Sequence, residues 1–190
     1  MRAALLAGAE RYRAAAGELA DAVAAASAEI STRLAAGGTA YFFGNGGSSA
    51  QAQHFAAEIT GRYKLERRGF AAVALGANAG EISAIANDYG YEQVFARPLE
   101  GLVRAGDVAV GLSGSGGSPN VVRALEVARR AGAWTLAFTG RAGGGSGGAV
   151  GEAADLALVV PADAVADVQE LHLALGHMLC ELVEEELAKS

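Results

Sequence analysis

The chain has 190 residues, 52% of them hydrophobic, and this length and composition fit one folded domain with a hydrophobic core. A formal net charge of −6 argues against nucleic-acid binding through phosphate neutralisation, and no apolar run of about 18 residues predicts a membrane span. The single cysteine, Cys180, excludes an internal disulfide, so we expect a cytoplasmic protein in a reducing compartment, with neither nucleic acid nor membrane as a partner.

The first predicted element covers residues 2–36. This segment is rich in alanine, carries apolar residues at helical spacing and ends at Gly37-Gly38, which predicts one long helix or two. Such a helix precedes the first strand and is apolar over much of its surface. We expect residues 1–37 to pack against another subunit and residues 38–190 to form the core of a single domain.

From Thr39 onward, short apolar runs alternate with helical patterns, which is typical of a parallel sheet covered by helices on both faces. The predicted strands are residues 39–43, 71–75, 108–112, 134–138 and 156–160. The predicted helices lie near residues 48–60, 79–86, 94–104, 119–131, 147–154 and 165–188. The glycine-rich residues 143–148 are interpreted as a flexible loop. The fold class is therefore α/β, a three-layer αβα sandwich around a five-stranded parallel sheet.

The loop after the first predicted strand is a candidate ligand site, because ligands of such sheets bind outside the carboxyl ends of the strands. Residues 44–47, Gly-Asn-Gly-Gly, suit a tight turn, and Ser48 or Ser49 can cap the helix that follows. Backbone amides at a helix N-terminus suit an anion or a polyhydroxy ligand.

The loop after the third predicted strand, residues 113–118, is the better candidate for a phosphate site. Its serines offer hydroxyl groups, and Ser118-Pro119 is typical of a helix start. Composition alone fits a plain turn equally well. No lysine follows these glycines, so the loop is not of the Walker type. A dinucleotide site is disfavoured, because Ser49 stands at the third glycine position and no acidic residue follows the second strand.

Two helices carry candidate chemistry. His54 and Glu58 are four residues apart, so both side chains can converge on one point. The last predicted helix places Gln169 and His177 on one stripe, with His172 at its edge. These residues also have non-functional interpretations. Glu58 could form a surface ion pair with Arg62, and His54 could be half-buried with its hydrogen bonds satisfied. The stripe on the last helix could be an edge that faces solvent, as the nearby Glu184 to Glu186 suggest. The basic residues Arg62, Lys64, Arg67 and Arg68 fit a solvated loop or a phosphate contact.

Taken together, these motifs resemble the phosphoheptose isomerase family of the sugar isomerase (SIS) domain superfamily. The resemblance covers nearly the whole chain. It rests on Gly44-Asn45-Gly46-Gly47-Ser48, on the segment from His54 to Tyr63, on Asn87-Asp88-Tyr89-Gly90, on residues 113–118, and on Gln169-Glu170-x-His172 with His177. It implies an aldose–ketose isomerase that converts sedoheptulose 7-phosphate into D-glycero-D-manno-heptose 7-phosphate. It also implies a flavodoxin-like fold and a homotetramer with active sites between subunits.

By this resemblance, Glu58 is the base that moves a proton between C1 and C2, and His177 is the acid/base partner. The implied Zn²⁺ ligands are His54, Glu58, Gln169 and His177. The implied substrate contacts are Asn45, Gly46, Gly47, Glu58, Asn87, Asp88, Ser113, Gly114, Ser115, Ser118 and Gln169. Gly114 departs from the Ser-Thr-Ser pattern of the family and removes one hydroxyl group. Zinc coordination would also lower the basicity of Glu58, which conflicts with its role as the base.

Two alternatives stay open at this stage. One is a catalytically silent SIS protein that senses a phosphosugar or binds another protein. The joint presence of Glu58, Gln169 and His177 argues against it, because a silent protein does not need all three. The other is an isomerase that acts on a different sugar phosphate.

Overall fold

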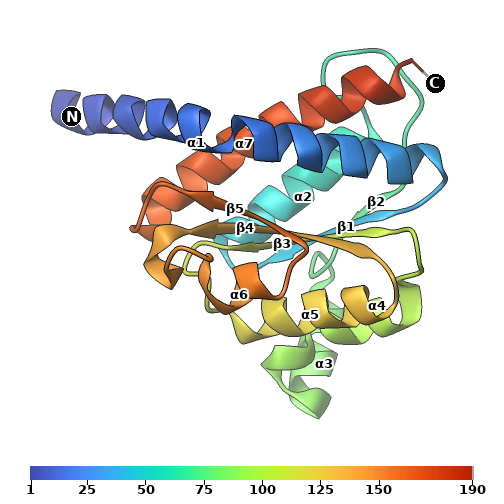
Figure 1. Ribbon diagram of the computed structural model, residues 1–190. Coiled ribbons are helices and arrows are strands. Elements are labelled where there is room, and N and C mark those ends of the chain that lie inside the picture. Colours follow the sequence, from blue (N-terminus) through green and yellow to red (C-terminus); the bar gives the residue numbers. More distant parts are fainter. Residues whose placement is uncertain (190) are drawn as a thin grey trace.

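A computed structural model describes residues 1–189 and shows a three-layer αβα sandwich (Figure 1). The strands are β1 (Ala40–Gly44), β2 (Ala72–Ala74), β3 (Val108–Ser113), β4 (Trp134–Gly140) and β5 (Leu156–Val160). All neighbouring strands are parallel, in the order β2-β1-β3-β4-β5. The predicted five-stranded, flavodoxin-like parallel sheet is therefore confirmed, and the strand order reverses between β1 and β3.

Helices cover both faces of the sheet (Figure 1). On one face lie α1 (Arg2–Ala35), α2 (Gly47–Thr60) and α7 (Val165–Leu187); on the other lie α4 (Ala96–Leu102), α5 (Pro119–Arg130) and α6 (Gly148–Glu152). The remaining helical segments are α3 (Ala79–Tyr89), η1 (Tyr91–Gln93) and η2 (Arg141–Gly143). Alternate residues of β1 enter separate cores, Phe42 beneath α2 and α7 and Phe43 beneath α4 and α5. Burial of β1 and β3 on both faces explains their unbroken apolar sequence.

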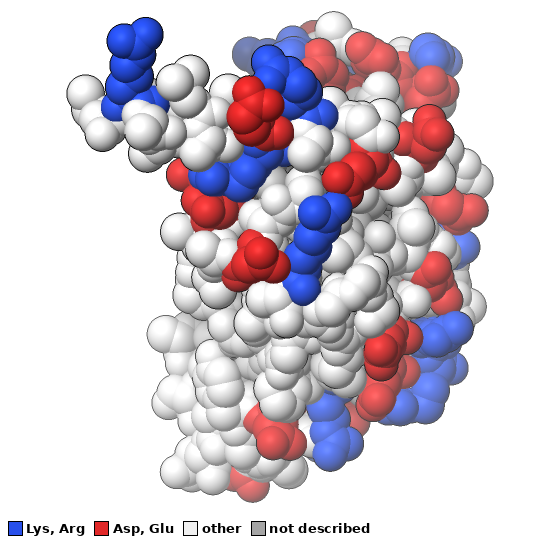
Figure 2. All heavy atoms as spheres, turned by 60° about the vertical axis from the view of Figure 1, so that its left-hand side comes forward, with Lys and Arg blue, Asp and Glu red and all other residues white. Residues whose placement is uncertain are grey.

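The N-terminal segment is one continuous helix rather than two. Its second half packs along α7 and buries Leu19, Val23 and Ile30. Its first turns project beyond the sandwich, and Leu5 and Leu6 are exposed there (Figure 1). None of the helices within residues 1–189 is long and apolar enough to cross a membrane. On the face drawn in Figure 2, acidic and basic side chains are intermixed around a broad uncharged region, without an extended basic patch.

Some local predictions were wrong. Helix α2 begins at Gly47 with Gly46 as N-cap, so neither Ser48 nor Ser49 caps it. The predicted solvent edge of the last helix does not include Glu184, which is 1% exposed. Nor is Arg67 solvated, because its side chain is 3% exposed and pairs with Glu184 at 3.2 Å. Sequence periodicity cannot reveal this burial, since it depends on how residues 61–71 fold back over α7.

Candidate active site

A pocket of about 170 Å³ lies outside the carboxyl ends of β1 and β3, where the strand order reverses. It is lined by Asn45, Ser48, Leu112, Ser113, Gly114, Ser115, Ser118, Val165 and Gln169. The structure thus brings the two predicted ligand loops together. The N-termini of α2 and α5 follow these loops directly, so their backbone amides favour an anion such as phosphate.

A hydrogen bond between its own serines stabilises the loop of residues 113–118. The hydroxyl oxygens of Ser113 and Ser118 are 2.9 Å apart, and Ser118 is the N-cap of α5 with proline at the first helical position. The carbonyl of Gly116 accepts a hydrogen bond from the Val150 amide, so the glycine-rich segment before α6 packs against this loop. A Cβ at Gly114 would lie 3.1 Å from a methyl of Val165, so a larger residue at this position would require Val165 to shift.

Asn45 is held by residues that the sequence did not reveal. Its side-chain amide exchanges two hydrogen bonds with that of Asn120, at 2.9 and 2.8 Å, and it accepts a third from the Tyr91 hydroxyl at 3.0 Å. Asn120 is 2% exposed. A buried amide requires such a partner, but neither its burial nor the approach of Tyr91 is visible in one sequence.

Gln169 belongs to this pocket. Its side-chain amide lies 3.4 Å from the Ser48 hydroxyl, and Gln51 donates a hydrogen bond to its backbone carbonyl at 2.7 Å. A Cβ at Gly47 would lie 2.8 Å from the Gln169 amide, which explains the glycine at that position.

A second cluster lies further along α2 and α7. The Nε2 atoms of His54 and His177 are 2.7 Å apart, so one ring donates a hydrogen bond and the other accepts it. A carboxylate oxygen of Glu58 is 3.6 Å from His54 Nε2, and the Glu58 side chain is 20% exposed. Arg62 pairs with Glu66 at 3.7 Å, so the surface pair between Glu58 and Arg62 is absent. Glu58, His54 and His177 thus face one another at a partly exposed site.

The two clusters are separate within one chain. Gln169 and His177 are eight residues apart on α7, which corresponds to about 12 Å along the helix axis. In this structure Gln169 contacts Ser48 in the pocket whereas His177 contacts His54, so these two predicted zinc ligands do not converge on one point. Among residues 1–189, no group of three or more His, Cys, Asp or Glu side chains is arranged to hold a metal ion.

Two predicted substrate contacts lie outside the pocket. Asn87 and Asp88 are exposed near the end of α3 and hydrogen-bond to each other at 2.8 Å. Helix α3 itself buries no residue and protrudes from the sandwich (Figure 1). Within residues 1–189 of one chain, these side chains make no hydrogen bond to the pocket or to the second cluster.

Comparison with known proteins agrees with this architecture. The SIS domain family matches residues 7–140. A phosphoheptose isomerase of Akkermansia muciniphila is 52% identical over 154 residues, which cover 81% of this chain and 79% of the relative. One from Aquifex aeolicus is 49% identical over 156 residues, with coverages of 82% and 80%.

Solved structures agree as well. The phosphoheptose isomerase of Neisseria gonorrhoeae superposes with a TM-score of 0.89 at 36% identity, covering 97% of this chain and 96% of that one. A phosphoheptose isomerase from Francisella tularensis gives a TM-score of 0.90 at 31% identity, with the same coverages.

Proposed function

Because the chain belongs to the phosphoheptose isomerase family of SIS domain proteins, it is a sugar-phosphate isomerase, and we propose that it converts sedoheptulose 7-phosphate into D-glycero-D-manno-heptose 7-phosphate. One observation carries this proposal. The carboxylate of Glu58 and the imidazoles of His54 and His177 lie on α2 and α7. The N-terminal parts of the same two helices line the pocket beside β1 and β3, which we call the anion pocket. These are the parts that an aldose–ketose isomerase requires, an anchor for phosphate and groups that move protons.

We propose that the reaction passes through an enediol. The Glu58 carboxylate takes a proton from C1 of the ketose, and the enediol forms as electrons move onto the C2 oxygen. The same carboxylate then returns a proton to C2, which gives the aldose. His177 moves the accompanying proton between the oxygens of C1 and C2. Positioned acid/base groups of this kind contribute typically 10²- to 10⁴-fold each.

The pocket beside β1 and β3 is proposed to bind the phosphate. The serine hydroxyls and the amides of the glycine-rich turns are its donors, namely those of Asn45, Gly46, Gly47, Ser113, Gly114, Ser115 and Ser118. Gly114 lacks a hydroxyl group but keeps its backbone N–H, so this loop binds phosphate chiefly through backbone amides and the remaining serines.

We also propose that Zn²⁺ binds at the second cluster. His54, His177 and Glu58 supply nitrogen and oxygen donors of the kinds that suit zinc, but the two imidazole nitrogens contact each other at 2.7 Å in this structure and would have to move apart to share a metal. When bound, the metal would supply an electrophile for the substrate oxygens. The fourth predicted ligand, Gln169, lies about two turns of α7 from His177 and contacts Ser48 instead, so we propose that a neighbouring copy supplies it. Metal analysis should find zinc in the wild type and a reduced zinc content in His54→Ala.

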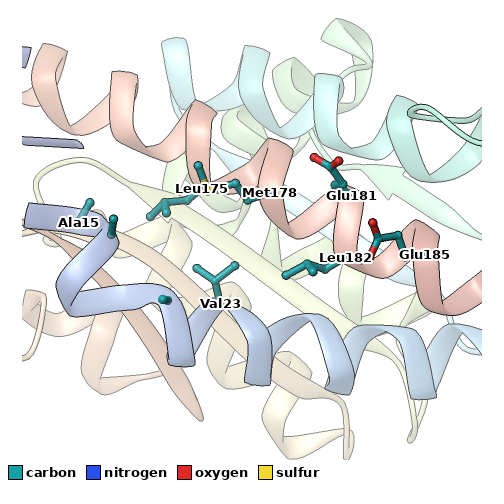
Figure 3. A pocket seen from close by; sticks show the side chains of 9 residues that line it. Ala15, Val23, Leu175, Met178, Glu181, Leu182 and Glu185 are labelled. Carbon is teal, nitrogen blue, oxygen red and sulfur yellow. The ribbon is translucent and has the colours of Figure 1, made fainter. Parts of the chain in front are cut away.

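This requirement supports the expected homotetramer with active sites between subunits. A groove of about 360 Å³ runs between α1 and α7, lined by Ala15, Ala16, Ala20, Val23, Leu175, Met178, Glu181, Leu182 and Glu185. Figure 3 shows Val23 and Leu182 pointing toward one another across it, with Glu181 and Glu185 beside Leu182 on α7. Met178 is 50% exposed and Leu182 is 37% exposed. An apolar groove along two long helices is the surface that we propose a second copy covers.

The proposed function is tested with Glu58→Gln, which keeps the size of the side chain and removes the base. We expect Glu58→Gln to abolish turnover while sugar-phosphate binding, measured by calorimetry, stays near the wild-type value. His177→Ala should lower kcat by at least ~10²-fold. The control is Glu66→Gln, because Glu66 is 90% exposed and should keep wild-type activity. Substantial turnover by Glu58→Gln would remove Glu58 as the base.

A further inference from the structure

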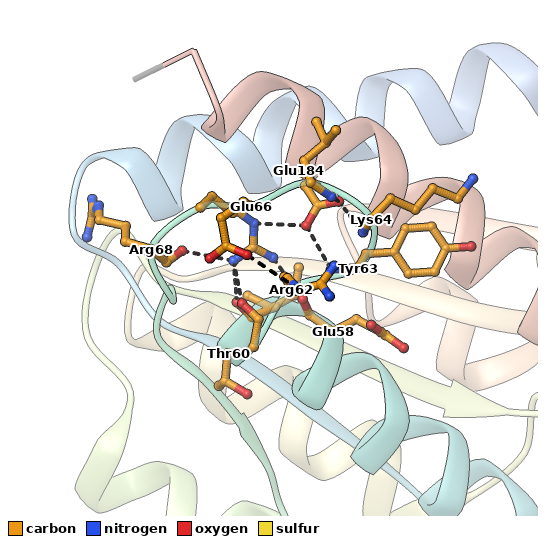
Figure 4. Close-up of polar contacts among 12 residues, drawn as sticks. Glu58, Thr60, Arg62, Tyr63, Lys64, Glu66, Arg68 and Glu184 are labelled. Atoms are coloured by element: carbon orange, nitrogen blue, oxygen red, sulfur yellow. Dashed lines mark hydrogen bonds and ion pairs between the residues drawn. The ribbon is translucent and has the colours of Figure 1, made fainter.

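A buried ion pair lies next to the second cluster, between α7 and the loop that connects α2 to β2. Figure 4 shows Glu184 of α7 pointing toward this loop. It joins Arg67 of that loop to Glu184 of α7, and the two side chains are 3% and 1% exposed. Every other ion pair found within residues 1–189 leaves each side chain at least 20% exposed. Burial of both charges requires an explanation, because desolvation can cost as much as the attraction returns.

Glu184 fixes the start of the loop. Its carboxylate accepts hydrogen bonds from three successive backbone amides, those of Tyr63, Lys64 and Leu65, at 2.7, 2.6 and 2.7 Å. Burial opposes the charge, but these donors and Arg67 outweigh it and hold the pKa of Glu184 below its ordinary value. The carboxylate is therefore ionised and anchors Tyr63 to α7.

Arg67 fixes the end of α2. Its guanidinium donates hydrogen bonds to the carbonyl of Glu58 at 2.8 Å and to that of Ile59 at 3.0 Å. It also bonds the carbonyls of Gly61 and Arg68. The Arg67 side chain therefore closes the last turn of the helix that carries Glu58.

The anchored loop reaches the other reacting group through Tyr63. The Tyr63 ring stacks on the His177 ring, with centroids 5.6 Å apart and planes 27° from parallel. His177 and Glu184 are seven residues apart, two turns along the same face of α7. The carboxylate that holds the Tyr63 backbone therefore also determines where the Tyr63 ring meets His177.

We propose that Arg67 and Glu184 are positioning residues for the isomerisation: together they hold Glu58 and, through Tyr63, His177 in the orientation that proton transfer requires. The inference rests on the proposed roles of Glu58 and His177. It accounts for a buried charge pair that the proposed function itself leaves unexplained. Neither residue contacts the anion pocket, so substrate affinity should depend on them little.

The test compares Glu184→Gln with Glu66→Gln, which removes a carboxylate from the same loop region but from an exposed site. A glutamine at position 184 keeps an acceptor for the loop amides and loses the charge that faces Arg67. We expect kcat to fall about 10- to 10²-fold, with KM changed less than about threefold. Glu66→Gln should match the wild type in both constants.

A second readout does not depend on activity. The ring protons of His177 feel the stacked Tyr63 ring, so their NMR resonances should move in Glu184→Gln and in Tyr63→Leu but not in Glu66→Gln. Only three histidines have to be assigned. Tyr63→Leu leaves the ion pair intact and keeps the test valid if Glu184→Gln fails to fold. We expect Tyr63→Leu to lower kcat as well.

Unmoved His177 resonances together with wild-type kcat, in either variant, would overturn the proposal. Failure of the proposed function gives a different pattern. In that case Glu58→Gln and His177→Ala keep their activity, whatever the His177 resonances do in Glu184→Gln.

Discussion

At the scale of single residues, His172 contributes to how the stability of the fold changes with acid. Its side chain is fully buried and its ring meets Phe138 edge-on at 5.5 Å. Burial lowers the pKa of His172 to about 4, from the ordinary value of 6.5. The unfolded chain therefore takes up a proton below pH 6.5 that the folded chain does not, and stability falls until the pH approaches 4. The shift corresponds to roughly 3 kcal/mol.

The prediction can be checked by urea unfolding between pH 7 and pH 5. Wild-type stability should fall with a slope that His172→Leu reduces by up to about 1.4 kcal/mol per pH unit, because the variant lacks that proton. Tm values measured across the same range should show the same difference. Parallel curves for the two proteins would show that His172 contributes nothing to the pH dependence.

At the scale of elements, the contact between α2 and α7 determines the second cluster. Gly176 makes this contact close: a Cβ at that position would lie 2.0 Å from the Phe55 ring. Phe55 is adjacent to His54, and Gly176 is adjacent to His177. The separation of the two helices therefore sets the 2.7 Å contact between the imidazoles.

Gly176→Ala should lower the free energy of unfolding by about 1–3 kcal/mol, because the new methyl group overpacks the core. It should also lower kcat, since a wider gap between the helices separates His54 from His177. The matched control is Gly101→Ala in α4, where an added Cβ meets nothing within 4 Å. Chemical unfolding and steady-state kinetics of both variants provide the measurements. Equal stability and activity of both variants would contradict this account of the α2–α7 contact.

Most elements could be predicted from the sequence because each one follows a simple pattern. Buried parallel strands are continuous apolar runs, and the helices between them keep a 3.6-residue period, so every predicted strand and helix has a counterpart. The cap of α2 was assigned to a serine, but Gly46 is the N-cap and makes no side-chain hydrogen bond. Strand β2 is shorter than predicted, at three residues, on the edge of the sheet.

The site was predictable only in part. Spacing along one helix predicted that His54 and Glu58 share a face, and the loops after β1 and β3 meet as the topology requires. Contacts between distant segments were not predictable. The hydrogen bonds between Asn120 and Asn45 depend on packing that leaves no periodic signal in one sequence. The same is true of the ion pair between Arg67 and Glu184. Helical spacing placed Gln169 and His177 on one stripe and the resemblance implied that both bind zinc, but they lie about two turns of α7 apart and contact different partners.

At the scale of the whole molecule, the groove between α1 and α7 should control assembly. Leu182→Glu places a charge on this apolar surface and should shift the protein to a smaller species in analytical ultracentrifugation. Activity should fall with it, because the proposed active sites combine residues of two copies. Leu102→Glu is the control, since Leu102 is 47% exposed on α4, on the opposite layer. An unchanged mass for Leu182→Glu would remove this groove from the interface.

The central claim is that the protein isomerises a ketose phosphate through an enediol formed by Glu58. The most direct measurement is NMR of the purified protein with sedoheptulose 7-phosphate in D₂O, with Glu58→Gln in parallel. We predict that the wild type forms a heptose 7-phosphate carrying deuterium at C2 and that the variant forms none. No product from the wild type, or turnover by Glu58→Gln close to that of the wild type, would contradict the claim.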